Sequence, residues 1–129
     1  MVDRFEDFHA WQRAEELKEE VFAFTSKPPA SKDFDFCRQI RDSARSAPRD
    51  IAEGFGRYYP SESIPFIRIA VGSLHETLNH LSDGLKRTFL TEKEHLKLKR
   101  LNLRAIKASK RWLEYLEGPG GQRFNRLRK

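Results

Sequence analysis

The chain has 129 residues, of which 34% are charged and 38% hydrophobic, and its formal net charge is +6. This length suits one domain with a single core. The first residues are too charged for a signal peptide, and no apolar run is long enough to span a membrane, so we expect a cytoplasmic protein. Cys37 is the only cysteine, which excludes an internal disulfide.

Positive charge is concentrated in the last third of the chain. Residues 1–30 carry a net charge of −3, residues 31–85 carry −1, and residues 86–129 carry +10. This asymmetry is the most informative feature of the composition.

The first predicted helix covers residues 7–25, where apolar residues recur every three or four positions. It ends before Pro28 and Pro29, because two consecutive prolines cannot continue a helix. We expect the apolar stripe to pack in the core rather than bind a ligand. The stripe consists of Phe8, Trp11, Ala14, Leu17, Val21 and Phe24.

The second predicted helix begins at residue 35 or 36 and runs to Phe55. Pro48 has no N–H and its ring crowds the preceding turn, so we expect a bend there. Gly54 and Gly56 are expected to take positive φ angles that end the helix. The buried stripe is Ile40, Ala44, Ala47, Ile51 and Phe55.

The exposed side of the same segment carries a row of arginines. We expect this row to be a solvated face, interrupted by Asp42 and Asp50. Arg49 and Glu53, four residues apart, are expected to pair on it. The row is Arg38, Arg41, Arg45 and Arg49.

The third predicted helix opens between Ser61 and Ser63 and runs to about residue 87. Pro65 fits only if it lies in the first turn. Gly72 and Ser73 lower helix propensity, so we expect another helix to approach closely there. The buried stripe is Ile67, Ala70, Val71, Leu74, Leu78, Leu81 and Leu85.

The fourth predicted helix starts with a capping box, Thr91 with Glu94, and runs to about Leu116. Six basic residues lie within about 40° of one line along it. They are Lys93, Lys97, Arg100, Arg104, Lys107 and Arg111. One apolar stripe would face the core, namely Leu98, Leu101, Ala105, Ala108, Trp112 and Leu116. A second is a candidate subunit interface, namely Leu96, Leu103, Ile106 and Leu113.

Four amphipathic helices with short links predict an all-α, antiparallel up-down four-helix bundle over residues 1–117. Residues 118–129 begin with a glycine-rich break, and we expect them to form a flexible basic C-terminal tail.

Three groups of residues together resemble a known family. They are residues 11–14, residues 39–41 with 48 and 51–57, and residue 62 with 66–67 and 69–76. These segments resemble the 23S rRNA-intervening sequence proteins, also called the S23 family. The motif and structural residues that carry the resemblance are Trp11, Pro48, Ile51, Ala52, Glu53, Gly54, Gly56, Arg57, Gly72 and Ser73.

The resemblance covers residues 5–117 and implies an all-helical bundle, a homopentamer and no established enzymatic activity. The chain departs from the family at Arg49 and Asp50, and at Tyr59, Ser63 and Pro65 around the start of the third helix. A more distant similarity is to accessory proteins of diversity-generating retroelements, which act through nucleic acid and reverse transcriptase.

No residue pattern predicts catalysis, a cofactor or a metal. Two Glu-x-x-His pairs, at residues 6–9 and 92–95, have the spacing of di-metal bundles. They would lie at opposite ends of an up-down bundle. His75 and His80 are five residues apart rather than four, which turns them onto different faces. Cys37 has no obvious base beside it and is expected to be buried. We therefore expect a protein that is not an enzyme.

Two hypotheses of function follow. The first is a non-enzymatic oligomeric scaffold that uses the second apolar strip of the fourth helix. The alternative is a nucleic-acid-binding accessory protein, for RNA or DNA, that uses the six basic residues of that helix. The two are compatible, because a ring of subunits would repeat the basic stripe.

Overall fold

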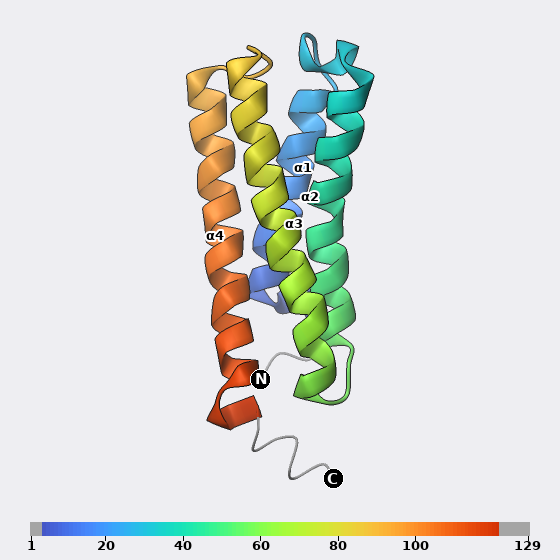
Figure 1. Cartoon of the computed structure of the whole chain (residues 1–129), viewed down its shortest axis with the longest axis vertical. Helices are drawn as coiled ribbons and strands as arrows, with labels where there is room; N and C mark the ends of the chain where they lie inside the picture. The colour runs from blue at the N-terminus through green and yellow to red at the C-terminus, as the bar shows by residue number, and fades with distance from the viewer. Residues whose placement is uncertain (1–3, 122–129) are drawn as a thin grey trace.

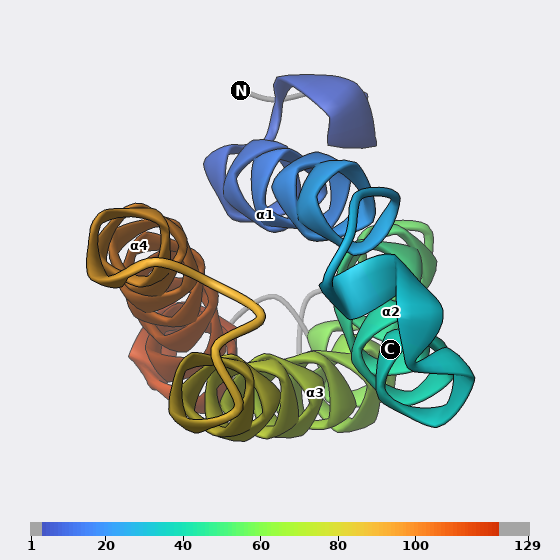
Figure 2. The same cartoon turned by 90° about the horizontal axis from the view of Figure 1, so that it is seen from above.

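The computed structural model describes residues 4–121, and within them the chain forms four long α-helices and no strand. Helices α1 (His9–Thr25), α2 (Phe34–Phe55), α3 (Pro60–Lys86) and α4 (Glu92–Glu117) run alternately up and down (Figure 1). Single 3₁₀ turns, η1 (Phe5–Asp7) and η2 (Ala30–Lys32), precede α1 and α2. Viewed from above, α1 lies between α2 and α4, which closes the bundle (Figure 2). The predicted antiparallel four-helix bundle is confirmed.

Apolar side chains from every helix meet on the bundle axis. Leu17 of α1, Ile40 and Ile51 of α2, Leu74 of α3 and Ala105 of α4 are all fully buried. Their spacing of three or four residues explains why the helices form, since each helix removes one apolar stripe from water.

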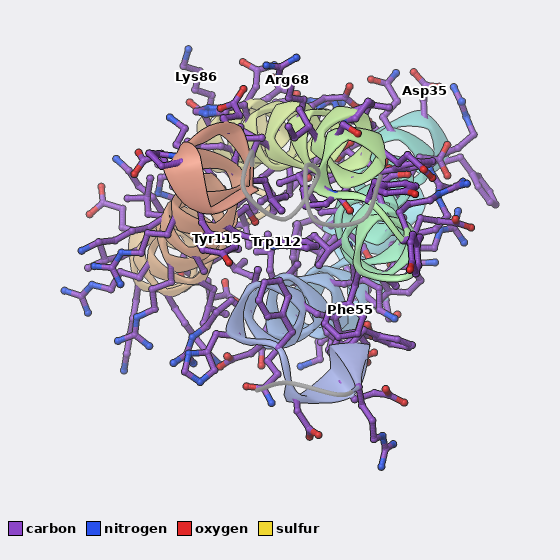
Figure 3. The ribbon with its side chains drawn as sticks, turned by 90° about the horizontal axis from the view of Figure 1, so that it is seen from below. Asp35, Phe55, Arg68, Lys86, Trp112 and Tyr115 are labelled. Atoms are coloured by element: carbon purple, nitrogen blue, oxygen red, sulfur yellow. The ribbon has the colours of Figure 1, made fainter. Side chains whose placement is uncertain are left out.

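Aromatic rings close the core at both ends. At the end where α1 begins and α4 ends, Phe8 packs edge-on against Trp112 at 4.4 Å. Phe55 lies 6.5 Å from Trp112 at the same end (Figure 3). At the other end, Phe36 packs edge-on against Phe89 at 4.9 Å. Such edge-to-face pairs add to the stability gained from burial alone.

The helix ends follow local chemistry. The predicted capping box is present in α4: Glu94 N–H donates to Thr91 Oγ1 at 3.1 Å, and Thr91 N–H donates to Glu94 Oε1 at 2.9 Å. Helix α3 begins at Pro60, whose fixed φ favours a first helical position. This start places Pro65 in the second turn, so the expectation that Pro65 lies in the first turn was wrong.

The glycines do not act through positive φ. Helix α2 continues through Pro48 and ends at Gly56, whose φ of −76° is right-handed. No glycine among residues 4–121 has a positive φ, so that expectation was wrong. Gly54 instead permits close packing, because a Cβ there would lie 2.7 Å from Ile67 Cδ1. A Cβ on Gly72 would meet nothing within 4 Å, so the expected close approach does not occur at Gly72, although Ser73 does contact Ser46 of α2. A Cβ on Gly84 would lie 3.0 Å from Phe36 Cζ.

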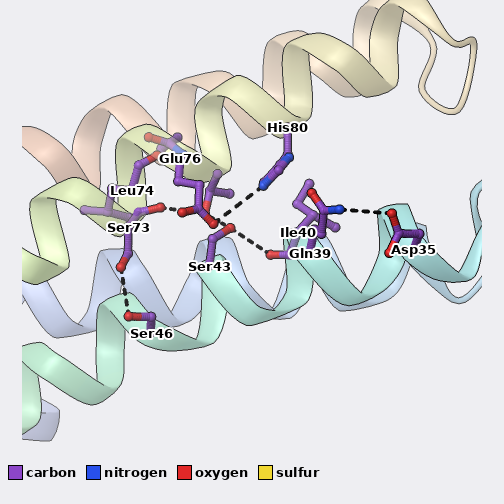
Figure 4. A network of polar contacts seen from close by, with 11 residues as sticks. Asp35, Gln39, Ile40, Ser43, Ser46, Ser73, Leu74, Glu76 and His80 are labelled. Carbon is purple, nitrogen blue, oxygen red and sulfur yellow. Dashed lines mark hydrogen bonds and ion pairs between the residues drawn. The ribbon is translucent and has the colours of Figure 1, made fainter.

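Small hydroxyl side chains set the contact between α2 and α3 (Figure 4). The hydroxyls of Ser43 and Thr77 are 2.7 Å apart in a buried bond, and Ser73 Oγ donates to Ser46 Oγ at 2.8 Å. Ser46 Oγ in turn donates to Asp50 Oδ2 at 2.9 Å. Polar pairs buried between helices satisfy each other in only one register, so they fix how α2 and α3 align.

Within residues 4–121, no helix is both long and apolar enough to cross a membrane. The predicted basic tail lies largely outside the described residues, which end at Gly121.

Candidate nucleic-acid interface on α4

The outer face of α4 carries an uninterrupted field of positive charge. Residues 95–113 contain seven lysines or arginines and no aspartate or glutamate. The core takes the opposite side of the helix, through residues such as Leu98, Ala105 and Ser109. All six predicted basic residues are exposed, and we call them the α4 basic stripe: Lys93, Lys97, Arg100, Arg104, Lys107 and Arg111. Lys99 and Lys110 lie beside them and are also exposed.

Five of the six stripe cations have no carboxylate within 4 Å among residues 4–121. The exception is Lys97, whose Nζ lies 3.3 Å from Glu20 Oε2 on α1. The arginine row on α2 is different, because three of its four charges lie near a carboxylate of the same helix. The fourth, Arg41, donates to the hydroxyls of Thr25 and Ser26. Arg38 pairs with Asp35 at 2.7 Å and Arg45 pairs with Asp42 at 2.6 Å.

The predicted pair between Arg49 and Glu53 is replaced by other partners. Glu53 pairs with Arg57 at 3.5 Å, and Arg49 lies 3.6 Å from Asp50. The arginines of α2 therefore form a mixed-charge, solvated face, as their sequence pattern indicates, whereas the α4 basic stripe is a face of one sign.

The spacing of the α4 basic stripe carries an energetic cost. Neighbouring cations stand three or four residues apart, and like charges at this spacing destabilise a helix by about 0.2–0.5 kcal/mol per pair at low salt. The stripe extends about 27 Å from Lys93 to Arg111, taking 1.5 Å per residue. An extended row of uncompensated cations attracts polyanions and raises their local concentration.

The residues of the second predicted apolar strip of α4 differ in their exposure to solvent. Leu96 and Leu103 are 48% and 45% exposed, whereas Ile106 is buried at 6%. Leu113 is half-buried. Only the first two side chains therefore remain available to a partner.

Tyr115 is a surface residue that the sequence pattern did not single out. It is 61% exposed on α4 and stands four residues after Arg111, at the end of the α4 basic stripe. The same three-or-four spacing that identified the cations would have placed it on their face.

The family-motif residues are distributed over α1, α2 and α3 rather than gathered with the stripe. Pro48, Ile51 and Gly54 are buried inside the α2 contacts, and Ser73 bonds to α2. Trp11 is half-buried, with its ring 5.2 Å from that of Phe5. The remaining motif residues lie at or near the surface: Ala52, Glu53, Gly56, Arg57 and Gly72. Their contacts are those of packing and helix ends.

Among residues 4–121, no group of three or more His, Cys, Asp or Glu could hold a metal ion. The two Glu-x-x-His pairs begin α1 and α4, which start at opposite ends of the bundle (Figure 1). Cys37 is buried, its Sγ donates to the Ala30 carbonyl at 3.1 Å, and burial raises the pKa of its thiol. This thiol is kept in its neutral, unreactive form.

The comparisons with known proteins agree with this architecture. Residues 6–110 match the family described as 23S rRNA-intervening sequence protein. A similar solved structure is that of a protein with unknown function from the S23 ribosomal protein family of Bacteroides thetaiotaomicron. It has 17% sequence identity and a TM-score of 0.74, and the alignment covers 81% of this chain and 98% of that chain. The likeness shows a shared fold. No curated protein matches the sequence.

Proposed function

This chain belongs to the 23S rRNA-intervening sequence protein family, and from that premise we propose that it is a non-enzymatic accessory protein that binds nucleic acid through α4. The observation that carries the proposal is the contrast between two helix faces. Arg38 and Arg45 of α2 are paired with carboxylates one turn away and Arg49 lies 3.6 Å from Asp50, whereas five cations of the α4 basic stripe have no such partner within residues 4–121.

A nucleic-acid backbone would supply the missing negative charge. Lysine and arginine bind phosphates without reading sequence, and each phosphate neutralised releases a counterion. The stripe carries no accompanying base-reading motif, so the proposal is binding with little sequence preference and a steep salt dependence.

Solubility alone is a weaker explanation of the stripe. A surface that only needs to stay soluble carries positive and negative charges interspersed, as the surface of α2 does. The α4 basic stripe instead places cations next to cations, at a cost to helix stability. Binding of a polyanion would offset that cost.

The test measures RNA and DNA binding by fluorescence anisotropy across a salt series. If all six stripe cations contact phosphates, the log–log salt slope for a single strand is about −4. We expect the variant K97Q/R100Q/R104Q/K107Q to lose most of its affinity and to reduce the slope to about −1. The melting temperature of this variant should not fall below that of wild type, since the substitutions remove like-charge neighbours.

A matched control removes the same net charge elsewhere. The variant R38Q/R45Q/R57Q/R68Q neutralises four exposed arginines that already have carboxylate partners. It should retain the wild-type slope. Undetectable binding at low salt, or equal losses in the two variants, would overturn the proposal.

We also propose that the chain works as a homo-oligomer. The exposed Leu96 and Leu103 support this, as does the five-subunit assembly that the family resemblance implies. Leucines that are about half exposed on the charged outer face of a helix are typical of surfaces that a partner covers.

A further inference from the structure

Tyr115 continues the α4 basic stripe as an aromatic group. It lies four residues after Arg111, so the two side chains share a face of the helix. With 61% of its surface exposed, the ring stands in solvent beside the last cation of the row.

The backbone after α4 supports this ring from one side. A Cβ placed on Gly120 would lie 2.7 Å from Tyr115 Cε2 and 3.2 Å from Cζ, so the backbone at Gly120 lies close to one side of the ring. Trp112, one turn earlier, points to the core and packs on Phe8 (Figure 3). The ring of Tyr115 is thus held in place while most of it remains accessible, which lowers the entropy cost of binding to it.

No other strongly exposed aromatic residue among residues 4–121 lies on α4. Phe34, 89% exposed, begins α2 and neighbours Asp35, which is paired with Arg38. Tyr58, 57% exposed, lies in the link between α2 and α3. Tyr115, which Glu114 and Glu117 flank in the sequence, is the strongly exposed ring among residues 4–121 that shares a face with the α4 basic stripe.

We infer that the nucleic acid bound by α4 is single-stranded and that Tyr115 stacks on one of its unpaired bases. The inference rests on the proposed function and adds the class of ligand. Proteins that bind single strands combine a cationic track with exposed aromatic rings, and each stacked base contributes about 1–3 kcal/mol. A duplex keeps its base faces inside the stack, so it offers Tyr115 nothing to stack on.

The experiment compares the full chain and its variants on two probes at fixed salt. The probes are a fluorescein-labelled RNA of about 20 nucleotides, longer than the stripe at 3.4 Å per nucleotide, and the same strand annealed to its complement. We expect wild type to prefer the single strand. Tyr115→Ala should bind the single strand about tenfold more weakly with an unchanged salt slope, since the phenol is uncharged.

Two further variants isolate stacking from other effects. Tyr115→Phe keeps the ring and should bind as wild type does. Phe34→Ala removes a still more exposed aromatic ring away from the stripe and should have no effect. Neither Tyr115 variant should change duplex binding.

The outcomes separate this inference from the proposed function. Equal binding of the single strand by wild type and Tyr115→Ala, or an equal loss in Tyr115→Phe, would overturn the stacking role while leaving the α4 basic stripe as a binding face. Equal affinity of wild type for strand and duplex would overturn the preference for single strands. Failure of wild type to bind either probe would remove the proposed function and this inference together.

Discussion

Gly54 and Gly72 occupy helices in the same chain, yet their surroundings are opposite. A Cβ on Gly54 would lie 2.7 Å from Ile67 Cδ1 and 3.3 Å from Phe66 Cβ. A Cβ on Gly72 would meet nothing within 4 Å. Glycine at position 54 is therefore required by the approach of α2 to α3, whereas glycine at position 72 only weakens its helix.

We expect Gly54→Ala to lower the free energy of unfolding by about 1–3 kcal/mol through overpacking. Gly72→Ala, the matched control, should raise it by about 0.5–1 kcal/mol through helix propensity. Ile67→Val removes the atom nearest the added methyl group, so Gly54→Ala should cost less in that background. Urea unfolding of wild type, Gly54→Ala, Ile67→Val and the double variant forms a double-mutant cycle that measures this coupling.

An additive cycle would show that Ile67 Cδ1 is not the obstacle. Destabilisation by Gly72→Ala in a monomeric sample would contradict the open surroundings of that residue. Destabilisation confined to an assembled sample would instead place Gly72 in a subunit contact.

These two glycines also mark what the sequence could predict at this scale. Gly54 and Gly56 after an apolar stripe correctly indicated the end of α2, because that signal is local. The partner of Gly54 is Ile67, thirteen positions away in the sequence, and its contact depends on how α3 is rotated. Periodicity places Ile67 in the core but does not identify the atom that it presses against α2.

At the scale of elements, one ion pair joins the start of α2 to the end of α3. Asp33 Oδ1 accepts from the Phe36 N–H at 2.9 Å, which caps α2, and its other oxygen pairs with Arg87. Arg87 also reaches Asp83 at 3.5 Å, and its guanidinium lies 4.6 Å from the centre of the Phe89 ring. The cap thus holds the link between α1 and α2 against the turn before α4.

This arrangement predicts a pH-dependent contribution to stability. The donated Phe36 N–H, and secondly Arg87, hold the pKa of Asp33 below its usual range. A carboxylate with a lowered folded pKa stabilises above its unfolded pKa, about 4, and loses that contribution as pH falls through the folded value. Asp33→Asn keeps a capping oxygen without the charge. Its melting temperature should fall below that of wild type at neutral pH and converge with it below about pH 4.

Thermal unfolding from neutral pH to about pH 3 measures this difference. Asp35→Asn is the control, since Asp35 makes exposed contacts within its own helix, with Arg38 and Gln39, and such contacts contribute little. A difference in melting temperature between wild type and Asp33→Asn that stays unchanged at acidic pH would contradict the role of the charge.

The elements themselves follow closely from the sequence, and the reasons are local. Apolar periodicity and the Thr91–Glu94 capping box placed the helix ends within a few residues of those observed. Pro60 was missed as the start of α3 because the serines after it suggested a later cap. The hydroxyl pair between Ser43 and Thr77 could not be predicted, since both residues have the spacing of ordinary helix positions.

For the whole molecule, the sequence predicted the charge but not its compensation. Counting cations located the α4 basic stripe. The Glu20 contact with Lys97, and the bonds from Arg41 to the hydroxyls of Thr25 and Ser26, depend on which faces the bundle brings together. The burial of Ile106 beside the exposed Leu103 has the same origin.

The exposed leucines make the assembly of the molecule testable. Leu96 and Leu103 are seven residues apart, the spacing at which one helix packs along another. Burying a leucine contributes about 1.5–3 kcal/mol, so two from every subunit favour association. We expect wild type to be a homo-oligomer at micromolar concentration by size exclusion with light scattering. Leu96→Gln with Leu103→Gln, which adds no charge beside the stripe, should yield a folded monomer, because both side chains lie outside the core.

Nucleic-acid binding by that monomer separates the contribution of assembly to affinity from the contribution of the stripe's charge. Its six stripe cations are untouched, so it should bind a short strand with the wild-type salt slope. A strand long enough to reach several subunits of wild type should bind the monomer more weakly than it binds wild type. The monomer lacks the neighbouring stripes that raise the effective concentration of binding sites. A wild type that is already monomeric would overturn the assembly. A double variant that loses short-strand binding would show that the two leucines belong to the nucleic-acid face itself.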